Sequence, residues 1–449
     1  MTSQPVRRKT TERGSVSVLF AVTMVFLLVP IVGLAIDAGV AYVIKAKLSA
    51  AVDAATLAAA RSLSIGQDVQ SQANSAGQTA LAYFNANFPD GLMNAHPTMP
   101  WSSDPNNGNV QQTSAAVRTV TITASAVSPL YFLSLFGQKT VTVAASGQAS
   151  RRDVNVVMVL DRSGSMATSG VCGTMKASAA SFVDKFSNGR DRLGLITFKG
   201  SAHVDFPSNL SFKPDLQTLI GTLQCAGNTG TAQALYLAHQ QFLSNGSLIY
   251  PGALNVILFF TDGLPNGIAA QYLPKGNCTS KNPPYLNGFL ADGPSGVFDT
   301  NGGLISDTSE HVLNSNQATG CAFQPSGSSR VVNDVVGIPA SDLFGSKIYP
   351  GFWSLPSIPI PITNTNINNA SLNAADDAAN NIRNDNITIY CIGESKSVDS
   401  TFLKRVANTT DAIGYKSTQP SGLYVYSPDG GQLSSAFETI ASQLLRISQ

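Results

Sequence analysis

The stretch that most restricts the fold is the run VNVVMVL at residues 154–160, which is followed at once by the polar loop DRSGS at 161–165. Nearly continuous aliphatic sequence of this length is typical of a parallel strand that is covered on both faces. A loop that leaves such a strand at its carboxyl end opens onto the crevice where open α/β sheets bind their ligands. Here the loop offers the carboxylate of Asp161 and the hydroxyls of Ser163 and Ser165. Hard oxygen donors of this kind suit Mg²⁺ or Ca²⁺.

In this context the pattern D-x-S-x-S resembles the metal-ion-dependent adhesion site of von Willebrand factor A domains. The second loop of that family supplies a threonine, and the sequence GNTGTAQAL at 227–235 matches it with Thr229 at the ligand position and Thr231 as a weaker candidate. The third loop supplies an aspartate after an apolar strand, and NVILFFT at 255–261 runs into Asp262. The ligand set that the resemblance implies is Asp161, Ser163, Ser165, Thr229 and Asp262.

A physical argument, independent of the resemblance, also supports a metal site. Asp161 and Asp262 would face each other across two adjacent strand ends, and two carboxylates are costly to bring together unless a cation neutralises them. Mg²⁺ takes six oxygens and usually keeps water, so the five side chains, some acting through water, would leave one position open. In the family a carboxylate of the bound partner fills that position. We therefore expect Mg²⁺, or else Ca²⁺ or Mn²⁺; the alternative is a turn that closes a strand and binds no metal.

Further strands and helices alternate along the rest of this region. The expected strands are 193–198, a short antiparallel edge strand at 202–206, 387–392 and 423–426; the expected helices are 174–186, 215–224, 231–244, 374–384, 401–408 and 432–447. Strands that alternate with helices of this size predict an α/β fold with a doubly wound, mostly parallel sheet. The von Willebrand factor A-like domain is expected to occupy 152–449.

The start of the chain predicts a membrane-spanning helix. No charged residue occurs from Gly14 to Ile36, and as a helix this stretch would span about 34 Å, against about 30 Å for the hydrocarbon layer. We place the transmembrane helix at 15–36; a cleaved signal peptide is the alternative, but its apolar core is usually shorter. Basic residues before the span predict that residues 1–14 are a cytoplasmic tail and that everything after Asp37 lies outside.

The alanine-rich segment from Asp37 to Arg61 should extend the helix well beyond the membrane surface. Leu48, Ala51, Ala55 and Ala58 recur at three- and four-residue steps and so form a small-residue face that suits close helix packing. The sequences RGSVSVLFA at 13–21, IDAG at 36–39 and AVDAATLAAA at 51–60 resemble the TadE/TadG-like family of tight-adherence (Flp-type) pilus assembly. A generic single-span anchor is the alternative.

Residues 37–150 are expected to combine this helix with a small α+β module. A second helix is predicted at 69–87, a polar connector at 93–115, half-buried strands around Ile122 and Val143, and a short apolar helix at 129–136. The segment 263–370 is an insertion rich in Gly, Pro, Asn and Ser, which favours loops, although its aromatic residues indicate partial order. It could form a lid or a partner surface, or be an insertion without a role.

The five cysteines fit an oxidising compartment. Cys278 and Cys321 both lie in the insertion and could staple it. Cys172 and Cys225 flank two of the metal-site loops that the expected fold brings together, so we predict a disulfide between them. Cys391 lies inside an apolar strand and is interpreted as a buried free thiol.

Composition and motifs argue against other functions. A net charge of +1 with 12% charged residues gives no basis for nucleic-acid binding, and signatures of nucleotide, metalloprotease and serine-hydrolase sites are missing from the sequence. We expect no enzyme and no small-molecule substrate. We expect instead a single-pass protein of the bacterial inner membrane whose periplasmic or cell-surface A-like domain grips an acidic group on a protein of the pilus-assembly machinery. A surface adhesin that uses the same site on a host or matrix ligand is the alternative, and a hydrolase or metal-insertion accessory is a third class.

Overall fold

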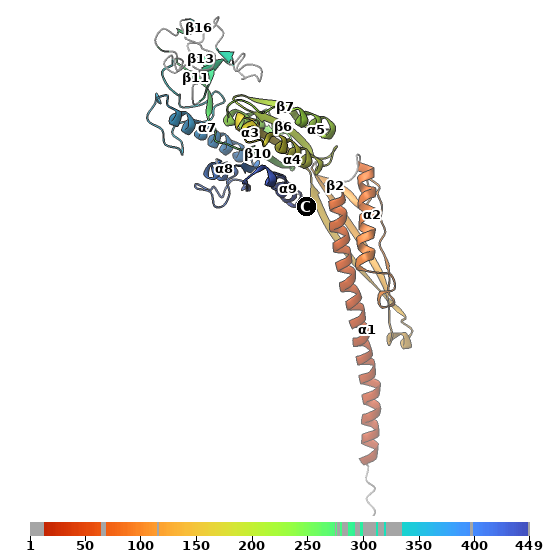
Figure 1. The fold of residues 1–449 in the computed structure, drawn as a ribbon. Coiled ribbons are helices and arrows are strands. Elements are labelled where there is room, and N and C mark those ends of the chain that lie inside the picture. The colour runs from red at the N-terminus through yellow and green to blue at the C-terminus, as the bar shows by residue number, and fades with distance from the viewer. Residues whose placement is uncertain are drawn as a thin grey trace, which may run out of the picture. The chain divides into compact units, whose positions relative to one another are not determined.

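The structure is a computed structural model that describes residues 13–63, 69–114, 116–273, 275, 279–280, 286–291, 297–299, 311–312, 318–319, 335–395 and 398–447. The chain divides into two compact units. Unit 1 comprises Met1–Thr113 and Arg118–Arg151, and unit 2 comprises Ser114–Val117 and Arg152–Gln449 (Figure 1). Cys278 and Cys321 lie outside the described residues, so their expected pairing stays a prediction.

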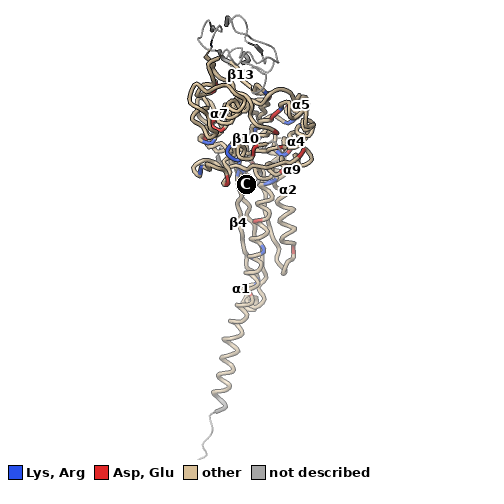
Figure 2. The backbone as a smooth tube through the Cα atoms, turned by 60° about the vertical axis from the view of Figure 1, so that its left-hand side comes forward, with Lys and Arg blue, Asp and Glu red and all other residues tan. Residues whose placement is uncertain are grey.

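Unit 1 begins with one long helix, α1 (Arg13–Ser62), which continues from the apolar stretch into the alanine-rich segment as predicted. Among the described residues, α1 is the helix that is long and apolar enough to cross a membrane, and little of its apolar stretch is buried by the protein. No charged residue lies between Gly14 and Ile36. The lower part of α1 accordingly shows neither blue nor red in Figure 2. The second helix, α2 (Val69–Asn87), has the predicted bounds.

The small residues of α1 form the core of unit 1 with α2 and a four-stranded sheet. Leu48, Ala51, Ala55 and Ala58 are all buried, so the small-residue face packs as its spacing indicates. The sheet has the order β1-β3-β2, with β4 also paired to β3. Its elements, with two 3₁₀ turns, are η1 (Leu92–Asn94), β1 (His96–Thr98), β2 (Val110–Ser114), β3 (Val117–Pro129), η2 (Leu133–Phe136) and β4 (Thr140–Arg152). The prediction of a connector at 93–115 was wrong in part, because β1 and β2 lie there and add to the sheet.

Unit 2 is built on a six-stranded sheet with the order β18-β17-β10-β5-β6-β7. The five strands other than β7 run parallel, and β7 is the antiparallel edge strand that the sequence predicts. Their bounds are β5 (Val154–Asp161), β6 (Arg192–Phe198), β7 (Ala202–Asn209), β10 (Leu254–Thr261), β17 (Thr388–Glu394) and β18 (Tyr424–Ser427). From β5 the chain builds the sheet outward to β7 and then returns to β10 on the other side, so the strand order reverses between β5 and β10.

Helices cover both faces of this sheet, which is the doubly wound architecture expected from the sequence (Figure 1). Val157 and Val159 of β5 pack with α6, α7 and α8, whereas Val156, Met158 and Leu160 pack with α4, α5 and α9. Every residue of β5 is buried, since both faces are covered. The helices are α3 (Gly164–Thr168), α4 (Cys172–Asp184), α5 (Lys213–Thr222), α6 (Thr231–Gln240), α7 (Asn364–Asn384), α8 (Ser400–Ala407) and α9 (Gly430–Ile447).

The described residues of the insertion after Asp262 include strands, in line with its aromatic content. Its strand β11 (Gly267–Tyr272) pairs with β13 (Leu286–Ala291), and Tyr272 and Ile348 are buried in the core beside α7. The smaller strands are β8 (Leu243–Ser244) and β9 (Ser247–Leu248) before the insertion, and β12 (Thr279–Ser280), β14 (Val297–Asp299), β15 (His311–Val312) and β16 (Ala318–Thr319) within it. The predicted end of the insertion, residue 370, was wrong. The helix that follows, α7, was expected to begin at 374 but begins at Asn364.

Candidate metal centre

The first candidate loop leaves β5 at the reversal point of the sheet and holds the Asp161 carboxylate in place. Asp161 is fully buried at the end of the strand. Its Oδ1 accepts a hydrogen bond of 2.8 Å from the backbone N–H of Ser163, and its Oδ2 accepts one of 2.6 Å from the Thr261 hydroxyl at the end of β10. The carboxylate is therefore fixed between the two adjacent strand ends, as the sequence predicts.

The two hydroxyls of the first loop contact each other and the second carboxylate, Asp262. Ser163 Oγ lies 2.9 Å from Ser165 Oγ, and Ser165 donates a hydrogen bond of 2.7 Å to Oδ1 of Asp262. Asp262 follows β10 directly and is buried, while Ser165 is exposed at the start of α3. The side chains of Ser163, Ser165 and Asp262 are thus linked by hydrogen bonds, and Ser163 binds Asp161 through its backbone N–H. This set of contacts reaches the surface at Ser165.

Thr229 lies beside the first loop because backbone hydrogen bonds hold the two loops together. Gly164 N–H donates to Gly227 O at 2.8 Å, and Ala226 N–H donates to Arg162 O at 2.8 Å. The Thr229 backbone N–H in turn donates to the amide oxygen of Asn266, 2.8 Å away in the third loop. Among the described residues, no hydrogen bond joins the Thr229 hydroxyl to the other four side chains, so the loops position it next to them without fixing its hydroxyl to them.

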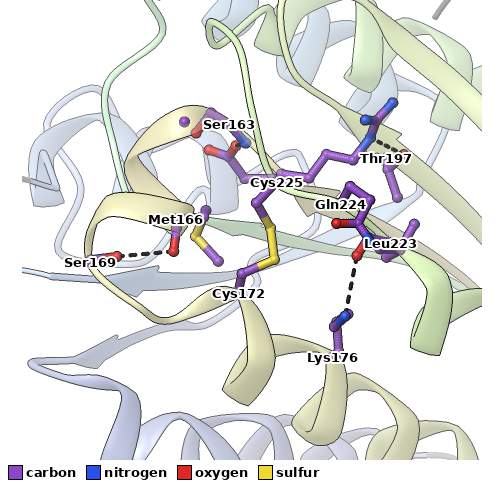
Figure 3. The surroundings of a disulfide bond; sticks show 12 residues. Ser163, Met166, Ser169, Cys172, Lys176, Thr197, Leu223, Gln224 and Cys225 are labelled. Carbon is purple, nitrogen blue, oxygen red and sulfur yellow. Dashed lines mark hydrogen bonds between the residues drawn. A yellow bond between two sulfur atoms is a disulfide. The ribbon is translucent and has the colours of Figure 1, made fainter.

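A disulfide reinforces the contact between the first two loops. Cys172 at the start of α4 and Cys225 just before the second loop are joined, which confirms the predicted pair (Figure 3). Next to it, Lys176 Nζ donates to the carbonyl oxygen of Leu223 at 3.2 Å. Cys391 is a buried free thiol in β17, again as predicted, and burial raises the pKa of that thiol far above its usual value.

The electrostatics of the two carboxylates favour a cation. Burial, followed by the repulsion of Asp262, raises the pKa of Asp161 to about 7. Burial likewise raises the pKa of Asp262, against the lowering effect of its hydrogen bond from Ser165. Both raised pKa values mean that the negative charge of the two carboxylates is not fully compensated by the surrounding protein. A divalent cation would supply the missing positive charge. The donor set of two carboxylates and three hydroxyls fits Mg²⁺, Ca²⁺ or Mn²⁺ by chemistry.

Other kinds of metal site are not found within the described part of the chain. There, no group of three or more histidine, cysteine, aspartate or glutamate side chains is placed to bind a metal. The candidate centre therefore depends on its hydroxyls as well as its two carboxylates. The weaker candidate, Thr231, is buried at the start of α6 and its hydroxyl finds no hydrogen-bond partner among the described residues.

Two residues of this region were missed by the sequence analysis. Thr261 binds the Asp161 carboxylate, and its position in the run TDG next to Asp262 could have indicated this. Glu394 ends β17, the strand next to β10, and is buried with an Oε2 atom that has no hydrogen-bond partner among the described residues. Burial, then Asp262 and Asp429, raise the pKa of Glu394. A third carboxylate therefore lies next to Asp262, at the end of the neighbouring strand.

Two segments match known families. Residues 156–264 match the family described as von Willebrand factor type A domain, and residues 14–62 match the family described as Flp pilus-assembly TadE/G-like. No curated protein matches the chain.

Solved structures resemble the chain only distantly. The von Willebrand factor domain of the type V pilus tip protein Mfa5 from Porphyromonas gingivalis has 17% identity and a TM-score of 0.39, with 67% of this chain and 98% of that chain covered. The PilB minor pilin from Streptococcus sanguinis, in a mutant form, has 14% identity and a TM-score of 0.39, with 79% and 80% covered.

A matrix protein from the mussel byssus, whose structure is described with zinc in its metal-ion-dependent adhesion motif, has 13% identity and a TM-score of 0.35. That match covers 64% of this chain, which spans only 47% of the mussel protein. The family matches and the sheet topology carry the assignment: this chain combines a TadE/G-like segment with a domain of the von Willebrand factor type A fold.

Proposed function

We propose that this chain is a membrane-anchored, extracytoplasmic component of a pilus-assembly system, and that unit 2 grips an acidic group on a protein partner through a divalent cation. The observation that carries the proposal is the meeting of Asp161 and Asp262 at the reversal point of the sheet, with Ser163 and Ser165 bridging them. The TadE/G-like match at 14–62 supports the pilus-assembly context.

In this proposal the five side chains divide the work of holding the ion. Asp161 and Asp262 supply negative charge from two adjacent strands, and Ser163, Ser165 and Thr229 supply neutral oxygens. The bound cation would offer a Lewis-acidic position to a carboxylate oxygen of the partner. Ser165 is the exposed member of the set, so the partner would approach from its side. This arrangement binds and holds a group, and it requires no bond to be made or broken.

The proposed topology places residues 1–14 in the cytoplasm, residues 15–36 across the inner membrane, and residues 37–150 with the A-like domain at 152–449 on the outer side. The test is protease added to spheroplasts. Digestion of unit 2 and retention of an intact N-terminus are expected. A mature N-terminus beyond Asp37, or a protected unit 2, contradicts this topology.

The partner is tested by crosslinking the full chain in its native membrane in Mg²⁺ and identifying what is recovered. The matched pair of variants is Asp161→Asn, which removes one charge from the centre, and Asp215→Asn, which removes an exposed charge on α5. A pilus-assembly protein should be recovered with wild type and with Asp215→Asn, and lost with Asp161→Asn or in EDTA. Recovery that is equal in all three chains refutes the metal-dependent grip, and recovery of host or matrix proteins alone makes the chain a surface adhesin.

A further inference from the structure

The tip of the β3–β4 hairpin in unit 1 exposes apolar side chains. Tyr131, Leu135 and Phe136 are 51%, 80% and 70% exposed. The sequence carries no charged residue from Thr119 to Gln138. Single exposed apolar side chains are ordinary on a protein surface, but a group of them around one short turn indicates a contact with something apolar.

The tip is held at one defined level of α1. The carboxylate of Asp37 is buried and accepts hydrogen bonds from three successive backbone N–H groups: Tyr131 at 2.8 Å, Phe132 at 3.1 Å and Leu133 at 2.8 Å. Asp37 is also the first charged residue after the apolar stretch of α1. The tip is therefore fixed where the proposed membrane span ends.

Part of the tip lies closer to the N-terminus of α1, beside the apolar stretch itself. A Cβ atom on Gly33 would lie 2.7 Å from side-chain atoms of Phe132, so this glycine lets the Phe132 ring lie directly against the helix. Gly33 precedes Asp37 by one helical turn, which corresponds to about 6 Å along the helix axis. The ring of Phe132 thus lies beside a part of α1 that would be inside the hydrocarbon layer.

We propose that the segment from Tyr131 to Phe136 is a second membrane contact of this chain, inserted into the outer boundary of the bilayer that α1 crosses. The proposal rests on the anchor in the proposed function. Aromatic side chains favour this boundary, the uncharged tip has no charged side chain to desolvate, and the exposed Lys139 beside it can reach lipid phosphates. Bilayer lipid is the occupant that the geometry favours over a second protein, because Asp37 and Gly33 place the tip at the end of the span.

This contact would restrict how α1 moves in the bilayer. A single spanning helix is free to tilt and to rotate about its axis in the bilayer. A second contact on one side of α1, fixed through Asp37, restricts both motions for unit 1. The hairpin would act as a short arm that sets the orientation of α1 relative to the membrane.

The test uses tryptophan as a depth probe in the full chain, embedded as single copies in nanodiscs of phosphatidylethanolamine and phosphatidylglycerol. Trp101→Phe and Trp353→Phe remove both native tryptophans. Three chains then each carry one probe: Phe136→Trp at the tip, Phe26→Trp in the apolar stretch, and Tyr83→Trp on an exposed face of α2. Lipids brominated at shallow or deep acyl positions report the depth of each probe.

Shallow bromines should quench Phe136→Trp and shift its emission to shorter wavelength, deep bromines should quench Phe26→Trp most, and Tyr83→Trp should stay unquenched. Adding Asp37→Ala to the tip probe should reduce its quenching to the level of Tyr83→Trp, because the tip loses its attachment to α1. An unquenched tip beside a quenched Phe26→Trp overturns the second contact and leaves the anchor intact. If Phe26→Trp is also unquenched, the anchor and the second contact both fail.

Discussion

Replacing Asp161 by asparagine should separate the metal site from ordinary fold stability. Burial and Asp262 raise the pKa of this carboxyl from 3.8 to about 7, so the folded state holds its proton more tightly than the unfolded state. The stability gained from that proton is full below about pH 4 and is lost as the pH rises through about 7. At pH 8 in EDTA the buried charge therefore disfavours the folded state by at most about 4 kcal/mol, at about 1.4 kcal/mol for each pKa unit.

Asparagine keeps the shape of the side chain and can still accept from the backbone N–H of Ser163. In EDTA at pH 8 the Asp161→Asn chain should therefore be more stable than wild type. Mg²⁺ should narrow this difference: at tenfold excess over its dissociation constant it adds about 1.4 kcal/mol to the stability of wild type. For a domain of this size that corresponds to a rise in the melting midpoint of roughly 3–6 °C. Asp161→Asn should show little or none of this rise.

The assay must follow unit 2 alone, because a chain of two units need not melt in one step. The sequence contains two tryptophans, Trp101 in unit 1 and Trp353 in unit 2. A Trp101→Phe background leaves Trp353, which packs against Phe402, as the reporter of unit 2. The control is Asp215→Asn, which should show the full Mg²⁺ response. An equal rise in wild type and Asp161→Asn would refute the reasoning, since the ion would then bind elsewhere.

Three further predictions concern other parts of unit 2. Replacing Cys172 and Cys225 together by serine should lower the free energy of unfolding by about 2–4 kcal/mol in chemical denaturation. Cys391→Ser is the control for replacing a cysteine outside the disulfide. Burial raises the pKa of Asp342 to about 7, so Asp342→Asn should gain stability over wild type as the pH rises from 4 to 8 and then level off; a pH-independent difference in urea titrations contradicts this. The Asn373 side chain bonds the backbone of the insertion three times, and Asn373→Ala should cost about 2–4 kcal/mol by the same titration, with a loss below 1 kcal/mol as the contrary result.

The sheet of unit 2 was predictable because its strands are aliphatic runs that end in turn or polar residues. The strand at 154–160 and the strand at 255–261 differ from β5 and β10 by one residue at one end each. The order of the ligand loops in the family that the sequence resembles predicted that the carboxyl ends of these two strands lie next to each other. The proximity of Asp161, Ser163, Ser165 and Asp262 could therefore be expected before the structure.

Other features depend on contacts that the local sequence does not encode. The first turns of α7 are rich in asparagine, a weak helix former, and they are helical because Ile367 and Ala370 are buried against the core. The position of Glu394 next to Asp262 depends on which strand lies beside β10. Strands β11 and β13 have few strand signals of their own, and pairing within the insertion stabilises them.

The disulfide between Cys172 and Cys225 has a mechanical consequence. A pilus component would carry tension, and a partner that pulls on the ion would load the first and second loops at once. Those loops are cross-linked by the disulfide and by the backbone bonds at Gly164 and Ala226, while β5 and β10 lie side by side as central strands of the sheet. In the proposed grip the cross-linked loops could not separate one after the other under load, so the coordination bonds to a bound ion would be the first to break. The domain would then release its partner while still folded, and it could bind again when the tension falls.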